Sequence, residues 1–261
     1  MRRALSFLTP FGRSTSPSPA ALNWFGVVGC LIGLAVGGVW WLSSKAWAAP
    51  GAAALALAAD VCFTGYLHLD GLADAADGLI PPLERARRLE AMADPAVGAF
   101  GIVTVAVVLL LRFGAFASSH PAPLVVGALW CASRTAMAEV TRSLPYARPG
   151  GLASAFMEDA SVPGSEGPEE DSGREGGQPG RSPHRLSRVH VSTFTGLALA
   201  VALAYLGRTW HGVAALAAEL LGVAAVVVLA RRRIGGFTGD VLGAAGVVGE
   251  TVGLLVLVAR W

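Results

Sequence analysis

The sequence predicts an all-α fold: a polytopic, membrane-embedded helix bundle of about seven transmembrane helices, with its N-terminus in the cytoplasm. Of the 261 residues, 54% are hydrophobic and only 15% are charged, whereas soluble domains carry about 25% charged residues. The mean hydropathy is +0.57. The apolar residues also fall in long stretches, which is typical of a chain that crosses a bilayer repeatedly. We therefore treat residues 1–261 as a single membrane-embedded domain.

Seven apolar stretches have a length that suits a hydrocarbon layer of about 30 Å. They cover residues 22–42, 49–67, 98–117, 122–140, 190–207, 211–230 and 241–259. The first ends with Trp40 and Trp41, an aromatic pair typical of the membrane interface. Two acidic residues, Asp60 and Glu219, lie inside the second and sixth stretches, and the sequence assigns neither of them a partner.

Two other segments are too polar to span a membrane. Residues 69–97 contain several aspartates, Pro81-Pro82 and a run of charged residues, so we expect a polar loop between two spans. Residues 162–187 consist largely of Gly, Pro, Ser, Glu and Arg. A segment with so few apolar residues cannot bury enough surface to offset its conformational entropy, so we expect a disordered cytoplasmic loop there.

The basic residues predict the orientation of the chain. With seven spans and a cytoplasmic N-terminus, only Lys45, Arg208 and Arg260 lie outside. The inner segments hold fifteen arginines: Arg2, Arg3, Arg13, Arg85, Arg87, Arg88, Arg142, Arg148, Arg174, Arg181, Arg185, Arg188, Arg231, Arg232 and Arg233. Positive charge is retained on the cytoplasmic side of the cell (inner) membrane. Polar segments far apart in the sequence then share the cytoplasmic face and can form one site.

Charge and cysteine content exclude several classes of function. The net charge is +2, and no basic stripe with interleaved aromatic side chains is present, so we predict no nucleic-acid partner. Cys30, Cys62 and Cys131 lie inside apolar stretches at unrelated spacings. This arrangement supports neither a disulfide framework nor a thiolate metal site. The remaining partners are the lipid bilayer and small molecules, and a homo-oligomer is left open.

The most informative motif is an acidic run that begins at His68 and ends at Leu79. If this run is helical, Asp70, Asp74 and Asp77 occupy positions i, i+4 and i+7, and their side chains fall within an arc of roughly 60°. Three carboxylates on one face repel one another unless a cation lies among them. A hard cation such as Mg²⁺ is commonly held by one or two carboxylates together with phosphate oxygens of a substrate.

A simpler interpretation assigns each aspartate a local structural role. Asp70 would cap the helix, Asp74 would lie in its first turn, and Asp77 with Gly78 would form the turn that ends it. We favour the metal site, because one helix needs only one cap. Gly71 and Gly78 lie beside the acidic face and would allow a neighbouring helix to approach closely.

Other polar residues are candidates for the same site. Asp94, just before Pro95, either caps a helix, adds a metal ligand or acts as a general base. Arg134 lies inside the fourth apolar stretch and either binds phosphate or forms an internal ion pair. Arg148 follows Tyr146 in a segment rich in turn residues. A guanidinium group suits the oxygens of a diphosphate, although a juxtamembrane anchor is the alternative.

A last group of candidates lies near the C-terminus. Gly239 and Asp240 stand at the entrance of the seventh stretch, where Asp is also a common cap. Glu250 lies deeper in the same stretch, and an ionisable residue at that depth indicates a function. We take Gly239, Asp240 and Glu250 as candidate substrate-binding residues together with Arg134, Tyr146 and Arg148.

These motifs resemble the cobalamin synthase family, the adenosylcobinamide-GDP ribazoletransferases. The strongest similarity is the run from Leu67 to Asp74, which continues to Asp77-Gly78-Leu79. Weaker similarities follow the family's order along the chain: Phe7-Leu8-Thr9, Met92 and Asp94 with Gly98-Ala99-Phe100-Gly101, Pro145-Tyr146-Ala147-Arg148-Pro149, and Thr238-Gly239-Asp240-Val241-Leu242-Gly243-Ala244.

The resemblance implies a Mg²⁺-dependent transferase of cobalamin biosynthesis, formed by one catalytic domain. Such an enzyme would join α-ribazole or its 5′-phosphate to adenosylcobinamide-GDP, giving adenosylcobalamin or its 5′-phosphate and releasing GMP. Asp70, Asp74 and Asp77 would bind the metal. Asp94 or Asp77 would act as the base, and Arg134 and Arg148 would hold phosphate oxygens.

The chain departs from the family pattern at two places. Pro10-Phe11-Gly12 stands where the family usually has Arg-Leu-Pro, and Pro95-Ala96 stands where it often has Ser-Arg. Phosphate contacts from those two arginines are therefore not expected here. The segment 162–187 is also longer than the family pattern leads us to expect.

Two other functions compete with this interpretation. A Mg²⁺-dependent CDP-alcohol-type phosphotransferase also uses an aspartate cluster, but its pattern has Ala-Arg where Ala73 is followed here by Asp74. A cation-coupled membrane transporter would place its ion site near the bilayer midplane. Asp60, Glu219 and Glu250 keep the transporter interpretation open.

Overall fold

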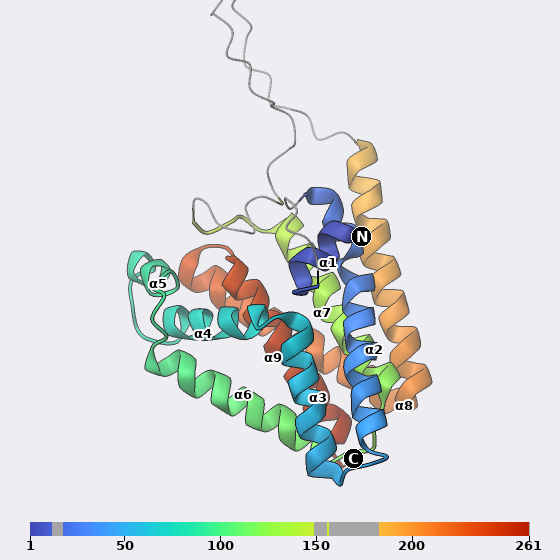
Figure 1. The fold of residues 1–261 in the computed structure, drawn as a ribbon. Coiled ribbons are helices and arrows are strands. Elements are labelled where there is room, and N and C mark those ends of the chain that lie inside the picture. Colours follow the sequence, from blue (N-terminus) through green and yellow to red (C-terminus); the bar gives the residue numbers. More distant parts are fainter. Residues whose placement is uncertain (12–17, 149–155, 157–182, 261) are drawn as a thin grey trace, which may run out of the picture.

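The computed structural model describes residues 1–11, 18–148, 156 and 183–260, and this part of the chain is helical (Figure 1). An isolated bridge between Tyr146 and Phe237 is the β-type pairing found among the described residues. The elements are α1 (Arg2–Leu8), the 3₁₀ helix η1 (Pro19–Trp24), α2 (Phe25–Ser43), α3 (Ala49–Thr64), α4 (Leu67–Leu79), α5 (Arg85–Ala91), α6 (Ala99–Ala117), α7 (Pro123–Ser143), α8 (Pro183–Ile234) and α9 (Gly239–Val258).

The all-helical prediction is confirmed, and several helices suit a membrane. By length and composition, the described residues contain four helices that could cross a bilayer: Pro19–Ser43, Ala99–Ala117, Val191–Ile234 and Gly239–Val258. A fifth span is counted if α3 and α4 are taken together, although they are bent by 87°. The predicted number of seven spans and the cytoplasmic N-terminus stay predictions.

Helix α8 is interrupted at Arg208 and Thr209, whose backbone angles are not helical. Gly196 contacts Thr135 and Gly207 contacts Val125, so the first half of α8 runs antiparallel to α7. After the break, Ala215 lies near Gly253 in α9, and Gly222 lies near Gly249, so the second half runs antiparallel to α9. The break falls in the gap that the sequence predicts between residues 207 and 211.

Two predicted loops differ from the structure. Residues 69–97 contain most of α4 and all of α5, because their apolar residues repeat with helical spacing between the charges. Of the predicted disordered segment, residues 162–182 lie outside the described part of the chain. Helix α8 begins at Pro183, so residues 183–187 are helical rather than part of a loop. Proline is well accepted at such a position, because the first turn of a helix needs no N–H donor there.

A sharp turn between α3 and α4 directs α4 across the bundle (Figure 1). Gly65 ends α3 with φ of 60°, and Tyr66 follows with φ of 62°. The left-handed region is freely accessible to glycine, which is why glycine commonly ends helices. The turn places α4 nearly perpendicular to α3, with contacts to α6 and α9.

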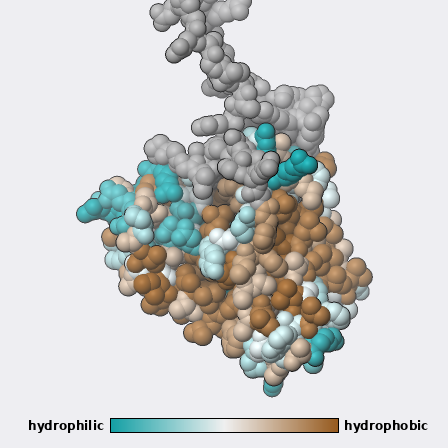
Figure 2. All heavy atoms as spheres, viewed as in Figure 1, coloured by the Kyte–Doolittle hydropathy of each residue, from teal (hydrophilic) through white to brown (hydrophobic). Residues whose placement is uncertain are grey.

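The surface is divided into an apolar belt and a polar end. Figure 2 shows brown, hydrophobic atoms over much of the visible face, with most of the teal, hydrophilic atoms near the end that carries α4 and α5 and fewer at the opposite end. Large apolar side chains are strongly exposed, among them Leu110, Phe194, Leu206 and Leu221. An extended apolar surface of this kind suits contact with lipid. The polar end therefore lies where the bundle meets water.

Candidate active site at the polar end of the bundle

The acidic run forms α4, as its spacing predicts. Asp70 is exposed, and Asp74 and Asp77 are half-buried on the same face of the helix. The opposite face buries Leu72 and Leu79 in the core. The helical period of 3.6 residues thus separates the carboxylates from the apolar side chains.

The carboxylates interact strongly with one another. Asp74 lies outside the four helices that suit a membrane. Its pKa is raised to about 6. The first cause is burial, and the next are the negative charges of Asp240, Asp70 and Asp77. The positive charge of Arg148 opposes this rise. The site therefore carries more negative charge than its own arginine compensates, which favours a bound cation.

The start of α9 joins this acidic face. Thr238 caps α9, and its hydroxyl accepts a hydrogen bond from the backbone N–H of Val241 at 3.3 Å. A Cβ atom added at Gly71 would lie 3.0 Å from the Cα atom of Asp240. Glycine at position 71 is what allows the two helices to approach so closely, as the sequence predicts.

A short backbone pairing brings the segment after α7 to the same place. Phe237 donates its N–H to the carbonyl of Pro145 at 3.1 Å, and Ala147 donates to the carbonyl of Phe237 at 2.8 Å. The rings of Tyr146 and Phe237 pack edge to face, with centroids 5.3 Å apart. As a result, Nη2 of Arg148 lies 3.2 Å from Oδ2 of Asp240.

Arginines hold the C-terminal end of α4. Arg88 donates to the carbonyls of Gly78 and Leu79 at 2.8 and 3.1 Å. Arg233 also donates to Leu79. Cations are favourable at the end of a helix whose last carbonyls lack partners. These arginines, which the sequence presents mainly as topology signals, also fix the position of α4.

Asp77 has a structural role that its sequence context does not reveal. Its two oxygens accept the backbone N–H groups of Gly98 and Gly101, at 2.7 and 2.9 Å. These groups belong to the first turn of α6, so Asp77 caps that helix from α4. This contact tests neither of its predicted roles, as metal ligand and as base, so both stay predictions.

We expect Asp77→Ala to destabilise the protein by about 1–2 kcal/mol, because it removes the cap of α6. Asp77→Asn keeps one acceptor oxygen and should lose less. The measurement is thermal unfolding of the purified protein in detergent. Equal stability of the alanine variant and the parent chain would show that the cap contributes nothing.

Asp94 lies apart from these contacts. Its side chain is exposed, and Oδ1 accepts the backbone N–H of Ala96 at 2.9 Å. Asp94 thus orders the turn before α6, close to the capping interpretation of the sequence. Its predicted role as a base stays a prediction.

Arg134 and Glu250 lie away from the acidic face, in a buried ion network. Arg134 contacts Glu250, and the Ser133 hydroxyl donates to the same carboxylate at 2.6 Å. Arg112 reaches the other oxygen of Glu250 at 2.7 Å and also binds Asp60. Each of these charged side chains is less than 9% exposed. Arg134 therefore forms an internal ion pair, which is one of the two roles that the sequence offers. Its partner, Glu250, lies on another helix.

Arg112 and Trp130 complete the network, and the sequence analysis does not select either. Trp130 donates its indole N–H to Asp60 at 3.0 Å. Arg112 also donates to the Thr251 hydroxyl at 2.9 Å and to the carbonyl of Val247 at 2.8 Å. The sequence does contain a signal that points to Arg112: it is an arginine in the middle of an apolar span, and an intramembrane charge needs a partner. Asp60 thereby acquires the partner that its sequence context lacks.

The carboxylate oxygens of α4 suit a metal ion that is shared with a substrate better than a metal ion held by the protein alone. Within the described part of the chain, no three His, Cys, Asp or Glu side chains are close enough to hold a metal ion by themselves. Mg²⁺ needs only one or two carboxylates when phosphate oxygens and water supply the rest. Asp70 and Asp74 offer such oxygens, and after burial the neighbouring carboxylates are the next cause of the raised pKa of Asp74.

Comparison with known proteins relates this arrangement to one family of enzymes. The chain is 36% identical over 271 aligned positions to an adenosylcobinamide-GDP ribazoletransferase of Bradyrhizobium diazoefficiens, covering 99% of this chain and 93% of the relative. It is 33% identical to the protein of that name in Chlorobaculum tepidum, with 99% and 93% covered. For the Chlorobium phaeobacteroides protein of that name the identity is 31%, with 93% and 89% covered. No solved structure matches the chain.

The similarity extends over nearly the whole chain, including α4, the segment after α7 and α9. The family model described as cobalamin-5-phosphate synthase matches residues 1–166 and 174–258. A match of this extent includes every residue of the acidic face and both of its neighbouring segments. The chain therefore belongs to the cobalamin-5-phosphate synthase family.

Proposed function

We propose that the protein joins α-ribazole, or its 5′-phosphate, to adenosylcobinamide-GDP. The products are adenosylcobalamin, or its 5′-phosphate, and GMP. The observation that carries the proposal is the acidic face of α4 with Arg148 beside it, in a chain whose relatives are named adenosylcobinamide-GDP ribazoletransferases. The reaction completes the nucleotide loop of the cobalamin.

The chemistry is a displacement at phosphorus. A ribose hydroxyl oxygen of α-ribazole attacks the phosphorus atom that is bonded to cobinamide. A new P–O bond forms while the P–O bond to GMP breaks, and GMP leaves with the electron pair. The hydroxyl proton passes to a carboxylate of the protein, for which Asp94 and Asp77 are the candidates. Such transfers depend mainly on positioning and on stabilisation of the developing charge.

Asp70 and Asp74 are the main proposed ligands of Mg²⁺. Asp77, the third ligand that the sequence predicts, would join them only if one of its oxygens left its backbone partner in α6. Bound there together with the diphosphate, the ion would neutralise charge on the phosphate oxygens and on the leaving group. Asp70 is exposed and Asp74 is half-buried, so both can face a substrate that arrives from water. Asp77 also keeps α6 in place through Gly98 and Gly101.

The remaining residues position the substrates. Arg148 lies beside the carboxylates, where its guanidinium group can bind diphosphate oxygens in a bidentate manner. Tyr146, Gly239 and Asp240 border the same region. Arg134 and Glu250 act from the buried network, and we assign them to positioning α9 and hence Asp240. We place this site on the cytoplasmic side of the inner membrane, following the distribution of arginines.

The test is an assay of the purified full-length protein in detergent. With adenosylcobinamide-GDP, α-ribazole 5′-phosphate and Mg²⁺, we expect GMP and a new corrinoid in equal amounts. Replacing Mg²⁺ with a chelator should abolish both products. A parallel reaction with a CDP-alcohol and the same acceptor should release no CMP.

Three results would contradict the proposal in different ways. Folded protein that yields no GMP with either acceptor would reject the reaction. Product formation that is unchanged by the chelator would keep the transfer but reject the metal site at Asp70 and Asp74. Release of CMP from a CDP-alcohol would favour the competing phosphotransferase.

A further inference from the structure

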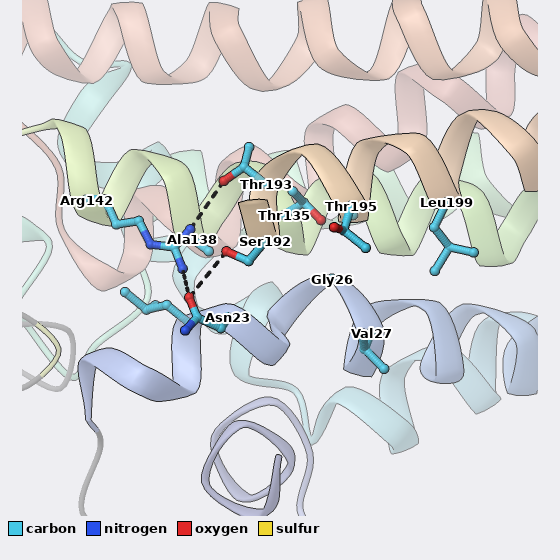
Figure 3. A pocket seen from close by; sticks show the side chains of 12 residues that line it. Asn23, Gly26, Val27, Thr135, Ala138, Arg142, Ser192, Thr193, Thr195 and Leu199 are labelled. Carbon is cyan, nitrogen blue, oxygen red and sulfur yellow. Dashed lines mark hydrogen bonds between the residues drawn. The ribbon is translucent and has the colours of Figure 1, made fainter. Parts of the chain in front are cut away.

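A second site lies on another side of the bundle, between α2, α7 and α8. Here a pocket of about 150 Å³ is lined by residues from the start of α2, the end of α7 and the start of the described part of α8 (Figure 3). None of the aspartates of the acidic face lines it. The proposed reaction does not use this pocket.

One end of the pocket is polar and is organised around Arg142. Nη2 of Arg142 donates to Oδ1 of Asn23 at 2.6 Å, and Nη1 donates to the hydroxyl of Thr193 at 3.3 Å. Among the described residues, Glu139 forms an ion pair with Arg142, at 3.9 Å from Nη1, and also accepts a hydrogen bond from the Thr193 hydroxyl at 2.8 Å. The Arg142 side chain is 12% exposed. Arg142 is therefore a cation that donates directly to two neutral groups, while the Glu139 carboxylate lies at the outer limit of an ion pair and is held by Thr193.

The other end of the pocket is apolar and open to the outside. Val27 and Leu199 line it with 37% and 36% of their surface exposed. Figure 3 shows both side chains displaced along the helices from Arg142. Gly26 and Gly196 both pack against Thr135, because a Cβ atom at either position would lie 2.4 Å from its Oγ1 atom. These close contacts bring α2 and α8 against α7, and we call the pocket between the three helices the slot.

The polar end of the slot matches the water boundary of a membrane, and its apolar end matches the acyl-chain region. Pro19–Ser43 and Val191–Ile234 are both helices that suit a membrane. Asn23 and Ser192 lie near the ends of those helices, whereas Val27 and Leu199 lie about 6 and 10 Å further in, at 1.5 Å per residue. The polar end thus lies at the boundary with water, and the apolar end faces the acyl chains.

We propose that this slot binds a glycerophospholipid, with the phosphodiester at Arg142 and an acyl chain along Val27 and Leu199. A guanidinium group in a partly dry position binds phosphate oxygens well. A soluble phosphate compound would use the polar end but would leave the lipid-facing wall empty. The continuous change from polar to apolar over the length of the slot selects a lipid.

The test is native mass spectrometry of the full-length protein in detergent, with added phosphatidylglycerol. We expect bound lipid, and Arg142→Gln should weaken binding by about tenfold or more through loss of a charge-assisted contact. Leu199→Trp should also weaken it by filling the apolar end. Arg231→Gln and Leu206→Trp are matched controls, since both residues are exposed and lie in α8 outside the slot. Neither control should change binding.

The outcomes separate a lipid from other ligands. Diacylglycerol, which lacks the phosphate, should bind more weakly than phosphatidylglycerol, and inorganic phosphate should not displace the lipid. Equal binding of diacylglycerol, or full displacement by inorganic phosphate, would overturn the proposal. So would equal effects of Arg142→Gln and Arg231→Gln. Arg142→Lys keeps the charge and should retain part of the binding, which identifies a folded protein.

Discussion

Asp74→Asn should lower the rate of GMP release by about a hundredfold or more, as expected when a group that stabilises developing charge is lost. The substitution keeps the shape of the side chain and removes its negative charge. Burial and three neighbouring carboxylates together raise the pKa of Asp74. A cation bound beside Asp74 would stabilise its charged form. The effect should fall on catalysis rather than on folding, because the amide relieves repulsion within the acidic face.

The measurement is initial rate against Mg²⁺ concentration for Asp74→Asn and the parent chain. Glu90→Gln is the matched control: it removes an acid from the neighbouring helix α5, where Glu90 forms an exposed ion pair with Arg87. We expect the control to keep the parent rate. Turnover of Asp74→Asn near the parent level would exclude Asp74 as a metal ligand, whatever the stability of the variant.

Arg112→Met should destabilise the protein by about 3–5 kcal/mol, because it leaves the buried carboxylate of Asp60 without its cation. Arg112 is 2% exposed and bridges Asp60 on α3 to Glu250 on α9. Methionine preserves much of the volume and apolar character of the arginine stem. The loss therefore measures the unpaired charges rather than a cavity.

Thermal unfolding in detergent measures this effect, with Arg87→Met as the control for loss of an exposed arginine. The control should unfold like the parent chain. Adding Asp60→Asn to Arg112→Met should restore part of the stability, because Glu250 still has Arg134 as a partner. If the double variant were no more stable than Arg112→Met alone, the unpaired charge of Asp60 would not be the cause.

The acidic face of α4 shows what the spacing of residues along the sequence can predict. Residues four and seven positions apart must lie on one side of a helix, so the common face of Asp70, Asp74 and Asp77 followed from their spacing alone. The close approach at Gly71 was also predictable, although its partner, Asp240, was not. Spacing says which residues share a face, but it does not say which element packs against it.

Contacts between distant residues were not predictable in the same way. Arg112 is 52 residues from Asp60 and 138 residues from Glu250. Arg148 is 92 residues from Asp240. The predicted spans hold two arginines, Arg112 and Arg134, and only the packing of the helices decides which acidic residue each of them meets. For this reason the sequence leaves Arg134 either at a phosphate or in an internal ion pair, and only the structure shows its contact with Glu250. Its role at the phosphate stays a prediction.

The sequence by itself determined the helical class, the apolar stretches, the acidic face and the resemblance that led to the family. These features depend on composition and on short periodic spacing, which the chain carries wherever its helices are placed. Only the tertiary structure decided that α4 lies across the bundle, that Arg112 joins Asp60 to Glu250, and that Arg148 reaches Asp240. Ion pairs and helix contacts of this kind depend on three-dimensional distance, which the spacing of residues along a chain does not specify.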